Sequence, residues 1–151
     1  MSTYSFIDVA ATIVGPGGSF SLGYGSGNAE EGISIAMTEE KNTMTVGADG
    51  SVMHSLHAGN SGTVTLRFLK TSPTNQMLSV MLDAQRVSSA LWGNNTIVIS
   101  DPARGDQISC RQCAFQRWPN VNYAKDGGVQ EWAFHAGMID GILGDGTSGS
   151  P

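Results

Sequence analysis

Short segments of apolar or alternating residues, separated by turn residues about every eight to fifteen positions, restrict this chain mainly to β-structure. The clearest segment is Thr63–Thr71, in which Val64, Leu66 and Phe68 alternate with largely polar residues. Alternation with a period of two places such side chains on one face of a strand. Breaks such as Gly15-Pro16-Gly17-Gly18 end several segments. The pattern therefore predicts a mainly β domain of many short strands.

Further strands are predicted at Phe6–Val14, Phe20–Tyr24, Gly32–Met37, Thr43–Val46, Ser51–Leu56, Ile97–Ser100, Gln107–Trp118 and Val129–Ile139. Asp49-Gly50 predicts a hairpin with a type I′ turn, in which both central residues have positive φ. Asp126-Gly127-Gly128 predicts a second hairpin turn.

One helix interrupts the strands. Ser72 is a suitable N-cap and Pro73 suits the first helical position, where a missing N–H costs nothing. The spacing predicts an amphipathic helix of about 15 residues, ending before Gly93. Its apolar face would consist of Met77, Leu78, Met81, Leu82 and Val87. Such a helix should close one open end or face of a small β-sandwich or β-barrel.

Length and charge narrow the function classes. The chain has 151 residues, which favours one domain, predicted at residues 1–143 with a flexible tail at 144–151. Thirteen acidic and eight basic residues give a net charge of −5, which argues against a general binder of nucleic-acid backbones. Charged residues make up only 14% of the chain, as suits a surface that partners cover. Neither a membrane span nor a secretory signal is expected, so we expect a cytoplasmic start.

Cys110-Arg111-Gln112-Cys113 is the one motif with metal or redox chemistry. It falls inside a predicted strand, where positions i and i+3 point to opposite faces. Two free thiols are therefore the favoured interpretation. A zinc site completed by His54 and His57, and an inter-subunit or stress-formed disulfide, stay open as alternatives.

No catalytic signature is evident elsewhere. The histidines lack the surroundings of a nucleophile elbow or a zinc protease, and the Gly-rich segment 15–27 lacks a phosphate-loop pattern. Arg104-Gly105-Asp106 is interpreted as a turn that matches a cell-attachment tripeptide by chance. We expect no catalytic residue, no metal and no cofactor, and hence a structural or binding protein and not an enzyme.

Three stretches, in order, give the chain a resemblance to a known family. They are Val46-Gly47-Ala48-Asp49-Gly50, Gly62-Thr63-Val64-Thr65-Leu66, and Thr71-Ser72-Pro73-Thr74-Asn75 with Leu78. With Trp132 in a final strand, the chain from about Tyr4 to Leu143 resembles the tail tube proteins of contractile-tailed (myovirus-type) bacteriophages. The resemblance implies a small β-sandwich or barrel with one helix, shared with type VI secretion tubes.

The resemblance also implies an assembly. Copies of such proteins form hexameric rings that stack into a hollow tube inside a contractile sheath, and DNA travels through the tube. The implied partners are other copies of the chain and the tail sheath, tape measure, baseplate and tail terminator proteins, in a virion tail assembled in the host cytoplasm. No membrane and no specific DNA binding are implied. The alternatives are another ring-forming tail, baseplate or secretion-tube protein, or a small β-barrel that binds a ligand.

Two groups of residues are candidates for roles in such an assembly. The segment Gly47–Gly62 is long for a simple hairpin, so we expect it to project and contact an adjacent ring. Its contact candidates are Asp49, Met53, His54, Leu56 and His57. Glu39 and Glu40 are candidates for an acidic channel wall that repels DNA phosphates.

The charges divide along the chain. The acidic clusters are Glu30-Glu31, Glu39-Glu40 and Asp49, all in the first half. Arg104, Arg111, Arg117 and Lys125 lie in the second half and are expected to face outward or to lie between subunits.

Overall fold

The computed structural model describes residues 9–21, 28–102, 104–119, 121, 123 and 125–144. Nine strands and one helix lie in these residues: β1 (Ala10–Gly15), β2 (Gly18–Ser21), β3 (Asn28–Met37), β4 (Asn42–Val46), β5 (Val52–Leu56), β6 (Gly62–Leu69), α1 (Thr74–Gln85), β7 (Asn95–Asp101), β8 (Asp106–Arg117) and β9 (Val129–Ile142). Most predicted strands are therefore confirmed with shifted ends. Of the predicted strands Phe6–Val14 and Phe20–Tyr24, residues 6–8 and 22–24 lie outside the described residues.

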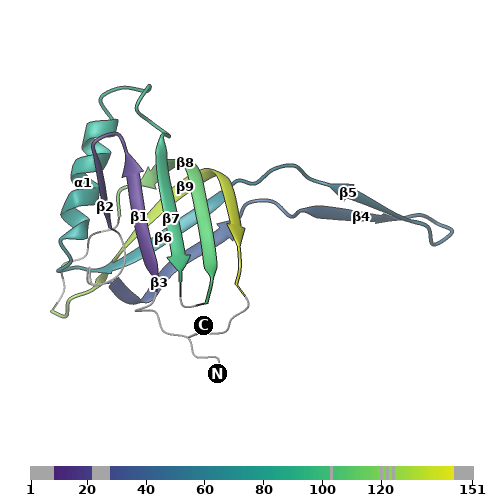
Figure 1. Cartoon of the computed structure of the whole chain (residues 1–151), viewed down its shortest axis with the longest axis horizontal. Helices are drawn as coiled ribbons and strands as arrows, with labels where there is room; N and C mark the ends of the chain where they lie inside the picture. The colour runs from purple at the N-terminus through teal and green to yellow at the C-terminus, as the bar shows by residue number, and fades with distance from the viewer. Residues whose placement is uncertain are drawn as a thin grey trace.

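Seven of the strands form one antiparallel sheet in the order β2-β1-β7-β8-β9-β6-β3. The sheet twists over on itself, so that β1 and β7 cross in front of β6 and β3 (Figure 1). Strands β4 and β5 pair only with each other, in a second sheet. The prediction of a mainly β fold with a sandwich or barrel form and one helix is confirmed.

The core lies inside this folded sheet and follows the period-two pattern. Along β6, Val64, Leu66 and Phe68 are at most 1% exposed, as their alternation predicts. Opposite them on β9, Trp132 and Phe134 are equally buried. The Phe115 ring of β8 packs edge-on against the Trp132 ring, with the centroids 6.0 Å apart. It packs tilted against the Phe134 ring, with the centroids 4.6 Å apart. These aromatic rings fill the centre of the domain.

The helix α1 covers one side of the core, but it differs from the prediction in extent and face (Figure 1). It begins at Thr74 and not at Pro73, and Ser72 Oγ accepts the Thr74 N–H at 3.3 Å. It ends at Gln85. Met77 and Val87, predicted to be in the apolar face, are exposed, and that part of the prediction is wrong. The buried stripe is Thr74, Leu78, Met81, Leu82 and Gln85.

A buried pair of amides fixes the helix to the sheet. Gln85 Nε2 donates to Asn95 Oδ1 at 2.6 Å, and Asn95 Nδ2 donates back to Gln85 Oε1 at 2.9 Å. Each amide also donates to a backbone carbonyl, Gln85 to Pro16 and Asn95 to Cys113. The two side chains are fully buried and satisfied, so they join α1, β7, β8 and the β1–β2 turn at one point.

The prediction that Cys110 and Cys113 face opposite sides of their strand is wrong. The pairing of β7 with β8 shifts register between Asn95 and Ile97, which marks a β-bulge around Arg111 and Gln112. Gln112 has a φ of 54°, the one positive φ of a non-glycine residue in the described chain. The extra residue reverses the alternation, so both thiols are buried in the core and both are free.

The turn between β4 and β5 also differs from the prediction. Gly50 has a φ of 89°, whereas Asp49 has a negative φ, so the turn is not of type I′. The turn spans residues 47–51, closed by the Gly47 N–H to the Ser51 carbonyl at 2.7 Å. The Asp49 carboxylate accepts the Ser51 N–H at 3.0 Å, which supports this longer turn.

Candidate assembly surfaces

The most prominent surface is a two-stranded arm, made of β4, the turn at 47–51 and β5. It projects from the domain on the side away from α1 (Figure 1). Every residue of β4 is exposed, and so is every residue of β5 except Ser55. A two-stranded hairpin that packs on nothing is marginally stable in water. The arm is therefore a surface whose apolar side chains lack cover within the described chain.

The arm has one strongly apolar face. Residues paired across antiparallel strands share a face, and the pairs Val46–Val52, Met44–His54 and Asn42–Leu56 alternate with Thr45–Met53 and Thr43–Ser55. On the first face Leu56 is 88% exposed, and the three apolar side chains beside it are more than half exposed. Contiguous exposed apolar surface of this kind marks sites of protein contact.

Polar contacts hold the base of the arm. The Lys41 ammonium donates to the Gly59 carbonyl at 2.7 Å and to Asn60 Oδ1. The His57 N–H donates to the Lys41 carbonyl at 2.9 Å, and His57 Nε2 lies 2.5 Å from Thr43 Oγ1. The arm therefore leaves the domain with its root tied on both strands, which gives it a defined direction.

The structure places the sequence-predicted contact residues together. Asp49 lies in the tip turn, Met53, His54 and Leu56 lie on β5, and His57 follows at the base. Glu39 and Glu40 lie just before β4 and are exposed. With Thr43 and His57 they line a shallow hollow of about 390 Å³ at the base of the arm. The two groups of candidates therefore meet at His57, at the base of the arm, whereas Asp49 lies at its far end.

The open edges of the main sheet are a second surface. Strands β2 and β3 end the strand order, so each has one side without a strand partner in the described chain. Such edges expose unpaired N–H and C=O groups that readily pair with a further strand. Strand β2 has 4 residues and β3 has 10, so β3 offers the longer edge.

The outward face of the sheet carries charges that cancel in pairs. Arg67 on β6 lies directly opposite Glu131 on β9, with Nε 3.2 Å from the carboxylate, and it also donates to Ser34 of β3 at 3.0 Å. Arg111 on β8 pairs with Asp140 on β9. Each pair joins opposite charges on neighbouring strands, so these four charges offset one another.

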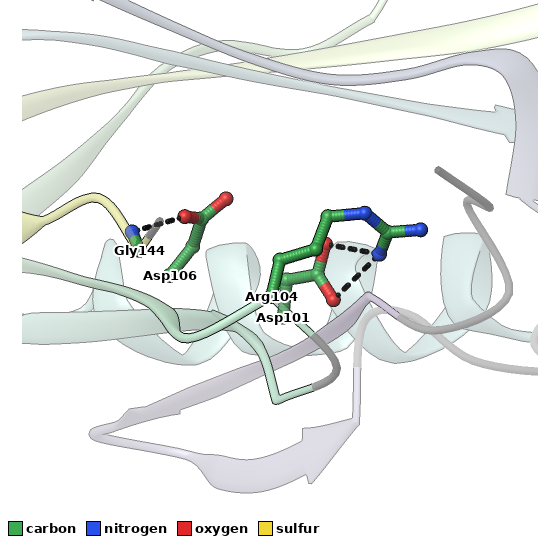
Figure 2. Close-up of polar contacts among 4 residues, drawn as sticks. All are labelled: Asp101, Arg104, Asp106 and Gly144. Atoms are coloured by element: carbon green, nitrogen blue, oxygen red, sulfur yellow. Dashed lines mark hydrogen bonds and ion pairs between the residues drawn. The ribbon is translucent and has the colours of Figure 1, made fainter. Parts of the chain in front are cut away.

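A buried ion pair lies at the opposite end of β7 from the helix connection. Figure 2 shows a single nitrogen of the Arg104 guanidinium, Nη1, donating to both oxygens of the Asp101 carboxylate, at 3.0 and 2.7 Å, and both side chains are at most 7% exposed. The expectation that Arg104 faces outward or lies between subunits is therefore wrong. Its Arg104-Gly105-Asp106 tripeptide forms the tight turn into β8, with a φ of 86° at Gly105.

The same turn anchors the end of β9. The Asp106 carboxylate accepts the Gly144 N–H at 2.6 Å (Figure 2). A Cβ added at residue 144 would lie 1.7 Å from the Arg104 carbonyl oxygen, so only glycine fits there. Gly144 is the first residue of the predicted tail, and the rest of that tail lies outside the described residues.

The last surface is an aromatic hollow of about 500 Å³, the tryptophan groove, at the C-terminal end of α1 and the end of β8. Its walls are mainly Leu82, Arg86, Trp92, Phe115, Arg117 and Trp118. Trp92 is 38% exposed and Trp118 is 55% exposed. Sequence reasoning missed this groove, because its residues come from three separate segments.

Nothing in the described residues resembles an active site or a metal centre. No group of three or more His, Cys, Asp or Glu side chains there is arranged to hold a metal. The cysteines lie in the core, whereas His54 and His57 lie on the arm, so the structure does not bring together the four residues of the zinc alternative. Burial raises the pKa of Cys110 to about 11 and of Cys113 to about 12, which suppresses thiolate chemistry. Within the same residues, no helix is both long and apolar enough to span a membrane.

Comparison with known proteins identifies relatives of the fold and of the sequence. No curated protein sequence matches the chain. A chain of the sheath–tube complex of PVC, an extracellular contractile injection system, in its extended state has a TM-score of 0.54 and 13% identity, with 88% of each chain covered. A chain of the 6-fold symmetrised baseplate of the anti-feeding prophage (AFP) has a TM-score of 0.50 and 8% identity, with 89% and 92% covered. The sequence model of a family described as "Bacteriophage PhiTE tail tube protein" matches residues 1–144.

Proposed function

Because the chain belongs to the bacteriophage PhiTE tail tube protein family, we propose that it assembles into stacked hexameric rings that form the inner tube of a contractile tail. The family is one of structural tube proteins, which agrees with the prediction of a protein that is not an enzyme. DNA passes through the tube on ejection. The observation that carries the proposal is the arm, an apolar hairpin that the described chain leaves uncovered.

Ring closure would use the open sheet edges. If β2 of one copy lies beside β3 of the next, each ring continues one sheet from subunit to subunit and leaves no edge unpaired. We expect the sheets joined in this way to form a continuous inner barrel. Subunits that touch only through loops, with both edges still open, would contradict it.

Ring stacking would use the arm. The adjacent ring would cover its apolar face, which includes His54 and Leu56. Asp49 at the tip, Met53 on the other face and His57 at the base would add to that contact. The contact with the tail sheath, tape measure, baseplate and tail terminator proteins would use other surfaces of the tube. Residues 1–143 would form the single tube domain and 144–151 its tail, in a virion tail assembled in the host cytoplasm.

Electron microscopy of the purified full-length protein tests the proposal. We expect six-fold rings or tubes from the wild-type chain. Leu56→Asp should abolish stacking, because it places a charge on the apolar face of the arm. The matched control is Gln76→Asp, which places the same charge on the exposed face of α1, away from the arm. A chain that stays a dispersed monomer under all assembly conditions would overturn the proposal.

Glu39 and Glu40 are proposed to lie near the channel wall. Repeated in every subunit, they would repel DNA phosphates and keep the DNA sliding. Substituting both with Lys should leave assembly intact but slow DNA ejection, and higher salt should relieve the defect because it screens the attraction. Particles that assemble and eject DNA at the wild-type rate would exclude these two positions as the repelling wall.

A further inference from the structure

We propose that the tip of the arm of one copy docks into the tryptophan groove of the next copy, where Asp49 meets Arg117. This inference rests on the proposed function and identifies the surface that receives the arm. It gives the two uncovered apolar surfaces of the described chain one common explanation.

The two surfaces match in chemistry. Val46 and Val52 pair at the end of the arm next to the tip turn, and both are more than half exposed. The groove offers the partly exposed side chains of Trp92 and Trp118 and a volume of about 500 Å³. Aromatic side chains that are half exposed around a hollow are typical anchors of protein interfaces. Aliphatic side chains entering such a hollow would remove apolar surface of both partners from water.

The charges are also complementary. Asp49 is the sole charged residue between Asn42 and Leu56, so the arm presents one negative charge at its tip. Three charged residues line the groove, and two of them, Arg86 and Arg117, are basic, whereas Asp83 is acidic. Arg86 lies 3.9 Å from Asp83, whereas the Arg117 guanidinium makes no ion pair or hydrogen bond with any described residue. Arg117 is therefore the group best placed to receive the carboxylate of a second copy.

The tip is prepared for this contact. The Ser51 N–H and hydroxyl bind the Asp49 carboxylate, which lowers its pKa and favours its charged form. The Gly47–Ser51 closure holds the turn in one form. A turn ordered in advance loses less entropy on docking than a mobile one.

The positions of the two surfaces suit an assembly and not a closed dimer. The arm leaves one side of the domain, while the C-terminal end of α1 and the 86–94 connection lie on the other side (Figure 1). A surface that pairs with a different surface of an identical copy makes a head-to-tail contact. Head-to-tail contacts produce rings or filaments, as a tube requires.

Charge reversal in the full-length protein tests the contact. Asp49→Lys and Arg117→Glu each place like charges face to face, so each alone should raise the concentration needed for assembly about tenfold or more. Both sites are exposed, so circular dichroism should show an intact fold. The matched control is Lys125→Glu, an exposed reversal outside the groove that should assemble as the wild type does.

Mixing the two variants gives the decisive result. The positive charge introduced at position 49 of one variant would meet the negative charge introduced at position 117 of the other. Where the arm belongs to the Arg117→Glu variant and the groove to the Asp49→Lys variant, the native Asp49 would meet the native Arg117. An equal mixture of the two variants should therefore form mixed tubes. Two of the three tryptophans line the groove, while Trp132 is 1% exposed, so assembly should also shift the tryptophan emission to shorter wavelength.

Three outcomes separate this inference from the proposed function. Wild-type tubes together with single variants that assemble normally would overturn the inference and leave the tube function standing. Single variants that fail and whose mixture also fails would overturn the inference as well. A wild-type chain that forms no ring or tube at all would overturn the proposed function.

Discussion

Cys110 and Cys113 lie on the same side of β8, both fully buried, because the bulge at Gln112 inserts one residue between them. In a regular strand these two positions would face opposite sides. The bulge therefore allows β8 to direct Cys110, Cys113 and Phe115 into one core. A backbone irregularity at one residue decides which side chains of the following segment are buried.

Gln112→Gly should stabilise the protein. The φ of 54° costs an ordinary residue about 1–2 kcal/mol, and the relief should exceed the extra entropy that glycine loses on folding. We expect a gain of roughly 0.5–1 kcal/mol in the free energy of unfolding, measured by urea denaturation. Gln112→Val is the control and should lose stability, because β-branched residues tolerate this conformation least. A valine variant as stable as the glycine variant would contradict the assignment of the bulge.

Stability should fall at alkaline pH through the buried thiols. Burial raises the pKa of Cys110 to about 11 and of Cys113 to about 12, from an ordinary value of 9.0, and for Cys113 the neighbouring Cys110 adds to the rise. The unfolded chain releases these protons first, so the contribution is complete below about pH 9 and is lost as pH rises through 11 to 12. Between about pH 8 and about pH 10.5, a Cys110→Ala/Cys113→Ala variant should lose less stability than the wild type. If the wild type and the double variant lose equal stability over this pH range, the two thiols do not have the raised pKa values that their burial predicts.

Breaking the buried ion pair should be costly. Asp101→Asn removes the charge that faces the Arg104 guanidinium, and both side chains are at most 7% exposed. Loss of one partner of a buried pair typically costs about 3–5 kcal/mol, because a buried charge loses its compensation. Thermal unfolding of the full-length protein measures the effect. Glu131→Gln is the control, since its pair with Arg67 is partly exposed and should contribute less than about 1 kcal/mol.

Gln85→Leu should weaken the attachment of α1. The substitution keeps the approximate size but leaves Asn95 and the Pro16 carbonyl without the partners that Gln85 provides. Unsatisfied buried polar groups cost about 1–3 kcal/mol each. Urea denaturation should show this loss, and hydrogen exchange should show faster opening of α1. Gln76→Leu, on the exposed face of the same helix, should change stability by less than about 0.5 kcal/mol.

Local patterns predicted the strands well where one face is buried and the other is not. Thr63–Thr71 became β6 because its alternation matches the burial of Val64, Leu66 and Phe68. The helix was overestimated because Val87 continues the apolar spacing, whereas Ser88 bonds locally to the Ala90 N–H beyond the helix end. Serines compete with the helical backbone in this way.

The surfaces were harder to predict than the core. Met44 and Leu56 have the composition of core residues, and they are exposed because no layer of the described chain covers β4 and β5. The bulge could not be predicted, because Gln112 interrupts no obvious pattern in the sequence. The tryptophan groove depends on the meeting of α1, the 86–94 connection and β8, which no local window contains.

An arm on one side of the molecule and a groove on the other have a consequence for length. A copy that fills its neighbour's groove still offers its own groove to another copy, so a row of such copies that does not close into a ring has no internal stopping point. The subunit would then specify the angle and spacing between neighbours but not their number. A defined length has to be imposed by a different molecule, one that measures the row or covers its last groove.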